Sequence, residues 1–179
     1  AQNINQNGTL TFELNNTSSY IYLPESFIVC EFEITKEDGT DLGNDNITLE
    51  HNFFPRMFSQ MRFNVGTNMI EEIQNPGEAD TLLKFISTSN HYKNVYGEFS
   101  GWIPDEGSSD TNNIGYKRRK IVYNTQFTIQ WYPAPLFGFC EYPKILYGMP
   151  VKFTMIHEKN NARIFYGAAG ETAATHTNA

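Results

Sequence analysis

The chain has 179 residues, a mass of 20.5 kDa and a formal net charge of −7. This length suits one domain, because domains usually hold roughly 100–200 residues. It contains 14 Phe and 10 Tyr but only 18% charged residues, which excludes intrinsic disorder. No apolar run approaches the roughly 18 residues of a membrane span. The negative charge argues against a specific nucleic-acid partner or an anionic membrane.

Apolar residues at every second position predict β strands along most of the chain. In chain order, the predicted strands are Leu10–Leu14, Tyr20–Leu23, Ile28–Ile34, Met61–Val65, Met69–Ile73, Phe127–Trp131 and Val151–His157. Turn-forming residues follow the third and fourth of these strands, at 37–40 and 66–68.

One inserted helix is predicted near 76–89. Asn75 and Pro76 suit the start of a helix, and Glu78 suits its positive end. Apolar residues then recur at helical spacing: Leu82, Leu83, Phe85 and Ile86. A shorter helical turn is predicted for 52–58.

The stretch 89–123 is predicted to be a long loop, because it is rich in glycine and contains the polar tract 108–113. Loops of that length in a compact domain are usually functional or lie at interfaces. The small, polar segment 167–179 is predicted to be a flexible tail or linker.

About eight short strands, one helix and long connections predict an all-β fold, an antiparallel β-sandwich formed by a single domain over residues 1–166. The long connections favour a jelly roll over an immunoglobulin domain, whose cysteine–tryptophan–cysteine pattern is absent.

Motifs for catalysis are absent, so we expect neither an enzyme nor a cofactor or metal site. No two histidines lie at metal-binding spacing, and no nucleophile elbow, Walker loop or dinucleotide fingerprint occurs. The loop 38–46 concentrates oxygen atoms and is either a hydrated turn or a calcium loop. Cys30 and Cys140 form either one disulfide or, as their apolar neighbours favour, two buried thiols.

Lys117–Lys120 is the one basic cluster of the sequence. It either contacts phosphate or an acidic patch on a neighbouring subunit, or belongs to a solvated loop.

The segment 131–139 breaks the alternation and carries two prolines, so its aromatic residues cannot all point inward. With the aromatic residues of the long loop, it would leave apolar surface that needs a partner. A protein–protein interface is favoured over a ligand groove, because no catalytic groups converge there. The candidate assembly contacts are Tyr92, Tyr96, Phe99, Trp102, Trp131, Tyr132, Leu136 and Phe137.

A series of motifs covers about two-thirds of the chain, from about residue 46 to 165. In order, they are 52–65, 69–73, 75–77, 81–87, 100–105, 136–141, 144–149 and 160–165. Their order and spacing resemble the major capsid proteins of the adintovirus and Maverick/Polinton group, which are double-jelly-roll virion proteins.

The resemblance implies a structural protein located in the virion, which assembles with copies of itself and other capsid proteins into trimeric capsomers. It carries over no catalytic residues. The family has two jelly rolls in tandem, whereas this length holds one, which leaves a first-roll portion, a single-roll relative or an adapted genomic copy.

A second hypothesis is a secreted carbohydrate-binding jelly roll. It would stack exposed Trp102, Trp131 or tyrosines on sugar rings and hold calcium in an Asp/Asn loop. A cupin-type enzyme is the weakest alternative, because the histidines are not clustered in sequence.

Overall fold

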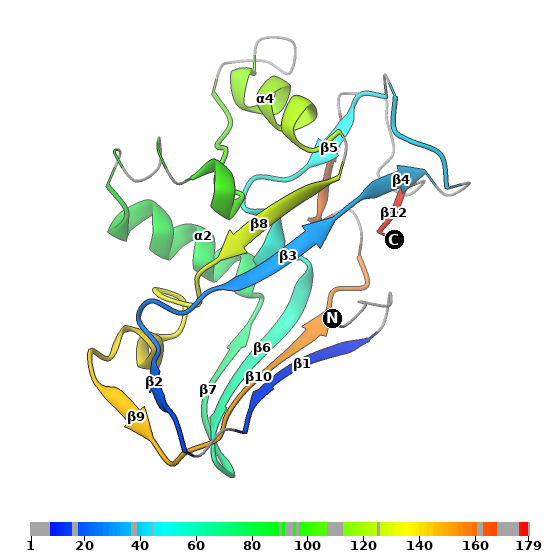
Figure 1. The fold of residues 1–179 in the computed structure, drawn as a ribbon. Coiled ribbons are helices and arrows are strands. Elements are labelled where there is room, and N and C mark those ends of the chain that lie inside the picture. Colours follow the sequence, from blue (N-terminus) through cyan, green and yellow to red (C-terminus); the bar gives the residue numbers. More distant parts are fainter. Residues whose placement is uncertain are drawn as a thin grey trace. The chain divides into compact units, whose positions relative to one another are not determined.

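The computed structural model describes residues 8–15, 18–36, 39–43, 45–89, 91, 95, 97–106, 113–124, 126–160, 163–167 and 176–178. Their secondary structure is mostly β, with several antiparallel strand pairings and few helices (Figure 1). Contacts divide the chain into two compact units. Unit 1 comprises Ala1–Ile28, Phe58–Thr88 and Tyr132–Lys159, and unit 2 comprises Val29–Met57, Ser89–Trp131 and Asn160–Ala179.

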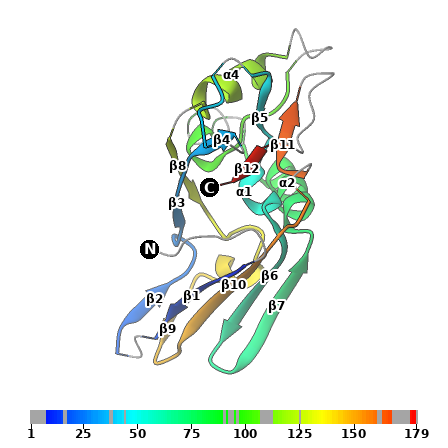
Figure 2. The ribbon, with the colours of Figure 1, turned by 90° about the vertical axis from the view of Figure 1, so that its right-hand side faces the viewer.

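Unit 1 contains a four-stranded antiparallel sheet in the order β1-β10-β6-β7 (Figure 2). The strands are β1 (Thr9–Leu14), β6 (Phe58–Val65), β7 (Asn68–Gln74) and β10 (Val151–His157). In β10, buried residues alternate with half-buried ones, as period-two patterning requires. A separate ribbon pairs β2 (Tyr20–Tyr22) with β9 (Ile145–Tyr147), and α2 (Pro76–Ser87) contacts β6.

Three rings form the core of unit 1. The ring centroids of Phe63 and Phe153, on neighbouring strands, lie 4.6 Å apart, and Phe137 lies 5.5 Å from Phe153. Phe137 precedes the short helix η3 (Gly138–Glu141). A Glu71 carboxylate oxygen accepts a 3.1 Å hydrogen bond from the backbone N–H of Phe139 and so ties η3 to β7.

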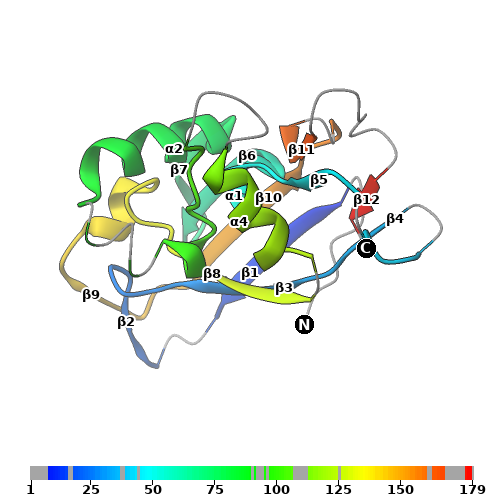
Figure 3. The same ribbon diagram turned by 90° about the horizontal axis from the view of Figure 1, so that it is seen from above.

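Unit 2 contains three two-stranded sheets. Figures 1 and 3 show β3 (Ile28–Phe32) beside β8 (Phe127–Trp131). The other pairs are β5 (Ile47–Leu49) with β11 (Phe165–Gly167), and β4 (Ile34–Lys36) with β12 (His176–Asn178). Strand β12 lies within the predicted tail.

The short helix α1 (Phe53–Arg56) supplies the centre of the unit 2 core. Phe53 is fully buried, and its ring lies 5.3 Å from those of Phe32 and Tyr123 and 5.8 Å from that of Phe127. Edge-to-face packing of this kind adds to the stabilisation from burial alone.

The predicted strands and the helix near 76–89 are confirmed, and the shorter helical turn is present as α1. The prediction of a continuous loop over 89–123 is wrong, because this stretch contains η1 (Glu98–Ser100) and α4 (Ile114–Val122). The Asn113 side chain caps α4 by accepting a 3.0 Å hydrogen bond from the N–H of Tyr116. Glycine-rich flanks and four consecutive basic residues concealed the helix from sequence reasoning.

Both cysteines are free thiols, Cys30 half-buried and Cys140 buried. Burial raises the pKa of Cys30 to about 11, and burial with the nearby charge of Glu71 raises that of Cys140 to about 12. Neither is therefore an ionised nucleophile near neutral pH.

Gly115 is predicted to tolerate no side chain. A Cβ there would lie 1.8 Å from the Pro104 carbonyl oxygen, so Gly115→Ala should cost at least about 2 kcal/mol of unfolding free energy. In an exposed helix the same change is stabilising. Urea unfolding tests this.

Gly138→Ala is the matched control, because the nearest atom to its Cβ would be the flexible end of Glu71, at 3.3 Å. Equal stability of Gly115→Ala and the wild type would contradict the close packing of α4 on the backbone of Pro104.

Candidate assembly surface

Four of the predicted contact residues are buried, so their predicted exposure is wrong. Trp131 and Phe137 are fully buried, and Trp102 and Leu136 retain 4% and 6% exposure. Trp131 packs on Phe54 with ring centroids 5.3 Å apart. The alternation does break in the segment 131–139, but the rings of Trp131 and Phe137 pack in the two cores instead of lying at the surface.

The other four predicted contact residues differ in their exposure. Phe99, in η1, is 66% exposed. Tyr132 is half-buried, and its ring lies 5.7 Å from that of Phe27. Tyr92 and Tyr96 lie outside the described residues. Of the original set, Phe99 alone has a described side chain in the exposed class.

A different aromatic surface lies on the β2–β9 ribbon. Tyr20 faces Tyr147 across the two strands, with ring centroids 4.9 Å apart, and Tyr22 faces Ile145. These four residues, here called the ribbon face, are 75%, 58%, 44% and 63% exposed in that order. Between them, Ile21 and Leu146 are half-buried. The side of the ribbon that carries the three tyrosines is therefore more exposed than the side that carries Ile21 and Leu146.

Helix α2 is also apolar on its outer side. Its exposed apolar residues, here called the α2 face, are Leu82, Leu83, Phe85 and Ile86. Leu82 and Ile86 are 65% and 82% exposed, whereas the Asp80 and Lys84 side chains are buried and form a 2.8 Å ion pair. A surface helix normally has the reverse polarity. The helix was predicted correctly, and its regularly spaced apolar residues are exposed although such spacing is typical of a buried face.

Most of the exposed large apolar side chains in the described part of the chain belong to unit 1. In unit 2 such residues are fewer: Val29, Val95 and Phe99 are scattered, and Ile114 and Ile121 belong to α4. Clustered exposed apolar residues mark interaction sites, whereas single ones are ordinary. The ribbon face and the α2 face are therefore the candidate assembly surface.

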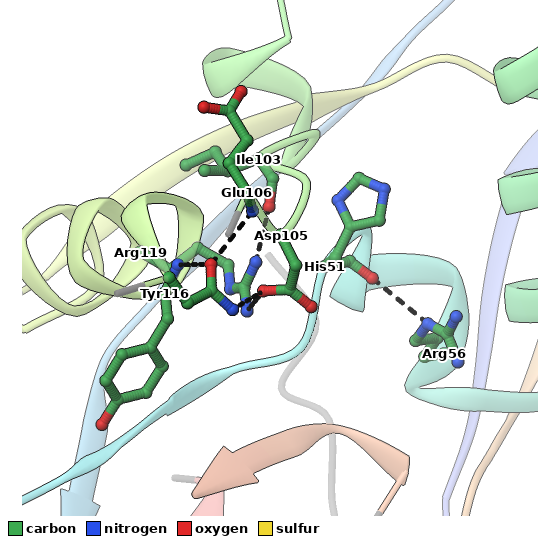
Figure 4. Close-up of polar contacts among 8 residues, drawn as sticks. His51, Arg56, Ile103, Asp105, Glu106, Tyr116 and Arg119 are labelled. Carbon is green, nitrogen blue, oxygen red and sulfur yellow. Dashed lines mark hydrogen bonds and ion pairs between the residues drawn. The ribbon is translucent and has the colours of Figure 1, made fainter. Parts of the chain in front are cut away.

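In unit 2, a buried arginine fixes α4 to the segment that precedes it (Figure 4). Arg119 is fully buried and donates 2.7 Å hydrogen bonds to the Ile103 carbonyl oxygen and an Asp105 carboxylate oxygen. The Asn113 side chain donates to the same Asp105 oxygen and accepts from the N–H of Glu106. Thus one member of the basic cluster is structural, and the cluster lies on a helix rather than in a loop.

Three titratable groups lie near this arginine. Burial and the charges of Arg119 and Arg56 lower the pKa of His51 to about 4. Burial raises the pKa of Glu50, although the same two arginines oppose the shift. Partial burial would raise the pKa of Asp105, but hydrogen bonds from Asn113 and Arg119 outweigh it and lower that pKa. At neutral pH this site holds a neutral imidazole and an Asp105 carboxylate.

No group of three or more metal-ligating residues occurs in the described parts of the chain. Asp38 and Asn44 of the proposed calcium loop lie outside those parts. Among the described helices, none has the length and apolar character to cross a membrane. A scan of protein-family models finds none that matches the chain, and a search of curated proteins finds no match.

Removing the carboxylate of Asp105 should leave the buried Arg119 charge without its partner. Because the Asp105 side chain is 43% exposed, we expect Asp105→Ala to cost about 1–3 kcal/mol, less than for a fully buried pair. The double variant Asp105→Ala/Arg119→Met should be no less stable than Asp105→Ala. Urea unfolding measures both.

The matched control is Glu106→Ala, since the hydrogen bond of that residue to Asn113 uses its backbone N–H. Equal losses for Asp105→Ala and Glu106→Ala would contradict this account of the network.

His51 should make the fold less stable in acid. The unfolded histidine binds a proton near pH 6.5 and the folded one near 4, so between these values the unfolded state holds more protons. The unfolding free energy should therefore decrease as the pH is lowered from 6.5 to 4, by at most about 1.4 kcal/mol per pH unit for this proton. His51→Gln should therefore lose less stability than the wild type between pH 6.5 and 4.5.

Glu50 and His157 titrate in both proteins, so the difference between them isolates His51. Equal pH slopes in urea unfolding would show that His51 does not have this role.

Proposed function

We propose that this protein is a structural virion protein, a capsid subunit without enzymatic activity or a cofactor. Its partners are then copies of itself and other capsid proteins, and its location is the capsid. The observation that carries the proposal is the pair of apolar surfaces on unit 1, the ribbon face and the α2 face. Both are formed by regular secondary structure, which holds contact residues in fixed positions.

The ribbon face has the composition of an interface centre. Tyrosines are enriched at interfaces because they bury large areas with few rotatable bonds. The Tyr20–Tyr147 and Tyr22–Ile145 pairs place three tyrosines and an isoleucine on one side of two short strands. Such a surface would exclude water from a contact with a flat apolar partner.

Two separate surfaces per subunit suit repetitive assembly. A contact between unlike surfaces generates rings or extended arrays, since each added subunit leaves one surface open until a ring closes. The net charge of −7 fits a shell subunit that contacts protein rather than the genome.

We further propose that the described sheets are parts of a jelly-roll sandwich of the kind found in the adintovirus and Maverick/Polinton capsid proteins. The ordered motifs from about 46 to 165 support this, as do the mostly β secondary structure and antiparallel pairings. For the carbohydrate-binding alternative, Trp102 and Trp131 are buried and could not stack on a sugar, which leaves the exposed tyrosines of the ribbon face as its stacking residues.

Sedimentation velocity and electron microscopy on purified protein test the proposal. We expect trimers, shells or other regular assemblies for the wild type. Ile145→Lys should shift the protein toward monomer, because it places a charge in the ribbon face; its exposed position should leave the fold intact.

The control is Thr67→Lys, at an exposed turn position of unit 1, which adds the same charge outside both apolar surfaces. A wild type that stays monomeric at all concentrations would contradict the proposal, as would assembly that Ile145→Lys and Thr67→Lys affect equally.

A further inference from the structure

Helix α4 presents a mixed apolar and cationic stripe. Ile114, Lys117, Arg118 and Ile121 follow the i, i+3, i+4, i+7 spacing of one helix face, and all four are exposed. The two isoleucines, 62% and 79% exposed, lie at the ends of the stripe, and the cations lie between them. We call these four residues the α4 face.

The opposite side of α4 is buried and fixes the helix in place. Arg119, Gly115 and Tyr116 are the buried residues of α4, and the Arg119 hydrogen bonds fix the helix to Ile103 and Asp105. The ring of Tyr116 also lies 5.5 Å from that of Tyr166 in β11. A partner would thus meet a preorganised surface, which lowers the entropic cost of binding.

The α2 face has the complementary character. Glu78 is its exposed acid in the first turn, and Leu82 and Ile86 follow at four-residue intervals. Lysine is absent from its outer side, because Lys84 is buried against Asp80. The α2 face thus offers apolar residues and one acid, whereas the α4 face offers cations between two isoleucines.

We infer that the α4 face of one copy docks on the α2 face of a second copy. The inference rests on the proposed self-assembly and names its contact surfaces. Packing α4 against α4 would bring like charges together, since each copy contributes Lys117 and Arg118. Packing α2 against α2 would leave the isoleucines of α4 uncovered. Pairing α4 with α2 sets Lys117 opposite Glu78 and brings an isoleucine of α4 onto the apolar residues that follow Glu78 in α2.

The cations differ in their present contacts. Arg118 forms an ion pair with Glu98 of η1 in the same unit, so its charge already has a partner. Lys117 lies at the centre of the stripe, three residues after Ile114 and four before Ile121. Lys117 is therefore the residue expected to face Glu78 of the second copy.

Charge reversal tests this pairing directly. Lys117→Glu and Glu78→Lys should each weaken self-association by about fivefold in sedimentation velocity, because each sets like charges opposite one another. An equimolar mixture of the two variants should associate more strongly than either variant alone, since contacts between unlike variants set opposite charges against one another. Stronger association in the mixture also shows that both variants are folded.

Lys159→Glu is the control, as it makes the same charge change at an exposed loop position. If the wild type assembles and the mixture is no stronger than either variant alone, this inference fails while the proposed function stands. A wild type that never associates overturns both. If Lys117→Glu instead leaves association unchanged and abolishes binding to anionic vesicles or DNA, the α4 face is a polyanion site and the inference is wrong.

Discussion

Aromatic packing in two small cores is the constraint on which the rest of the molecule depends. Phe63, Phe137 and Phe153 fill one core, and Phe53 with its neighbouring rings fills the other, at centroid distances of roughly 5–6 Å. Interiors packed to this density accept no further ring without strain. Apolar residues that do not pack into these cores lie at the surface, and in unit 1 eight of them form the ribbon face and the α2 face.

A polar constraint complements the apolar one. A buried guanidinium is costly unless its donors are satisfied, and Asp105 with the Ile103 carbonyl supplies acceptors to Arg119. The same contacts fix the orientation of α4, in which Ile114, Lys117, Arg118 and Ile121 are exposed. In this way a buried ion pair determines which residues of the basic cluster can meet a partner.

Sequence reasoning predicted the strands well, because alternation is a local property that survives tertiary packing. It also predicted the position of α2, because helical spacing is likewise a local property. It did not predict which side of α2 is buried, since nothing local indicates that Asp80 and Lys84 form a buried ion pair. Burial of Trp131 and Phe137 depends on partners distant in sequence, such as Phe54 and Phe63. The ribbon face escaped prediction because strands of three residues show almost no periodicity, although Tyr20 and Tyr22 gave a weak signal. The α4 helix was missed because its flanks are rich in glycine and it carries four consecutive basic residues, and the burial of Arg119 depends on an acceptor outside the helix, at Asp105.

The central claim is that the ribbon and α2 faces become covered when copies of the chain meet. Hydroxyl-radical footprinting at increasing protein concentration measures this directly, because it reports the exposure of individual side chains. The account predicts that oxidation of Tyr20, Tyr147, Leu82 and Ile86 falls as assembly proceeds, while that of Val29, an isolated exposed residue in unit 2, stays constant. Unchanged oxidation of those four side chains in the assembled state would contradict it.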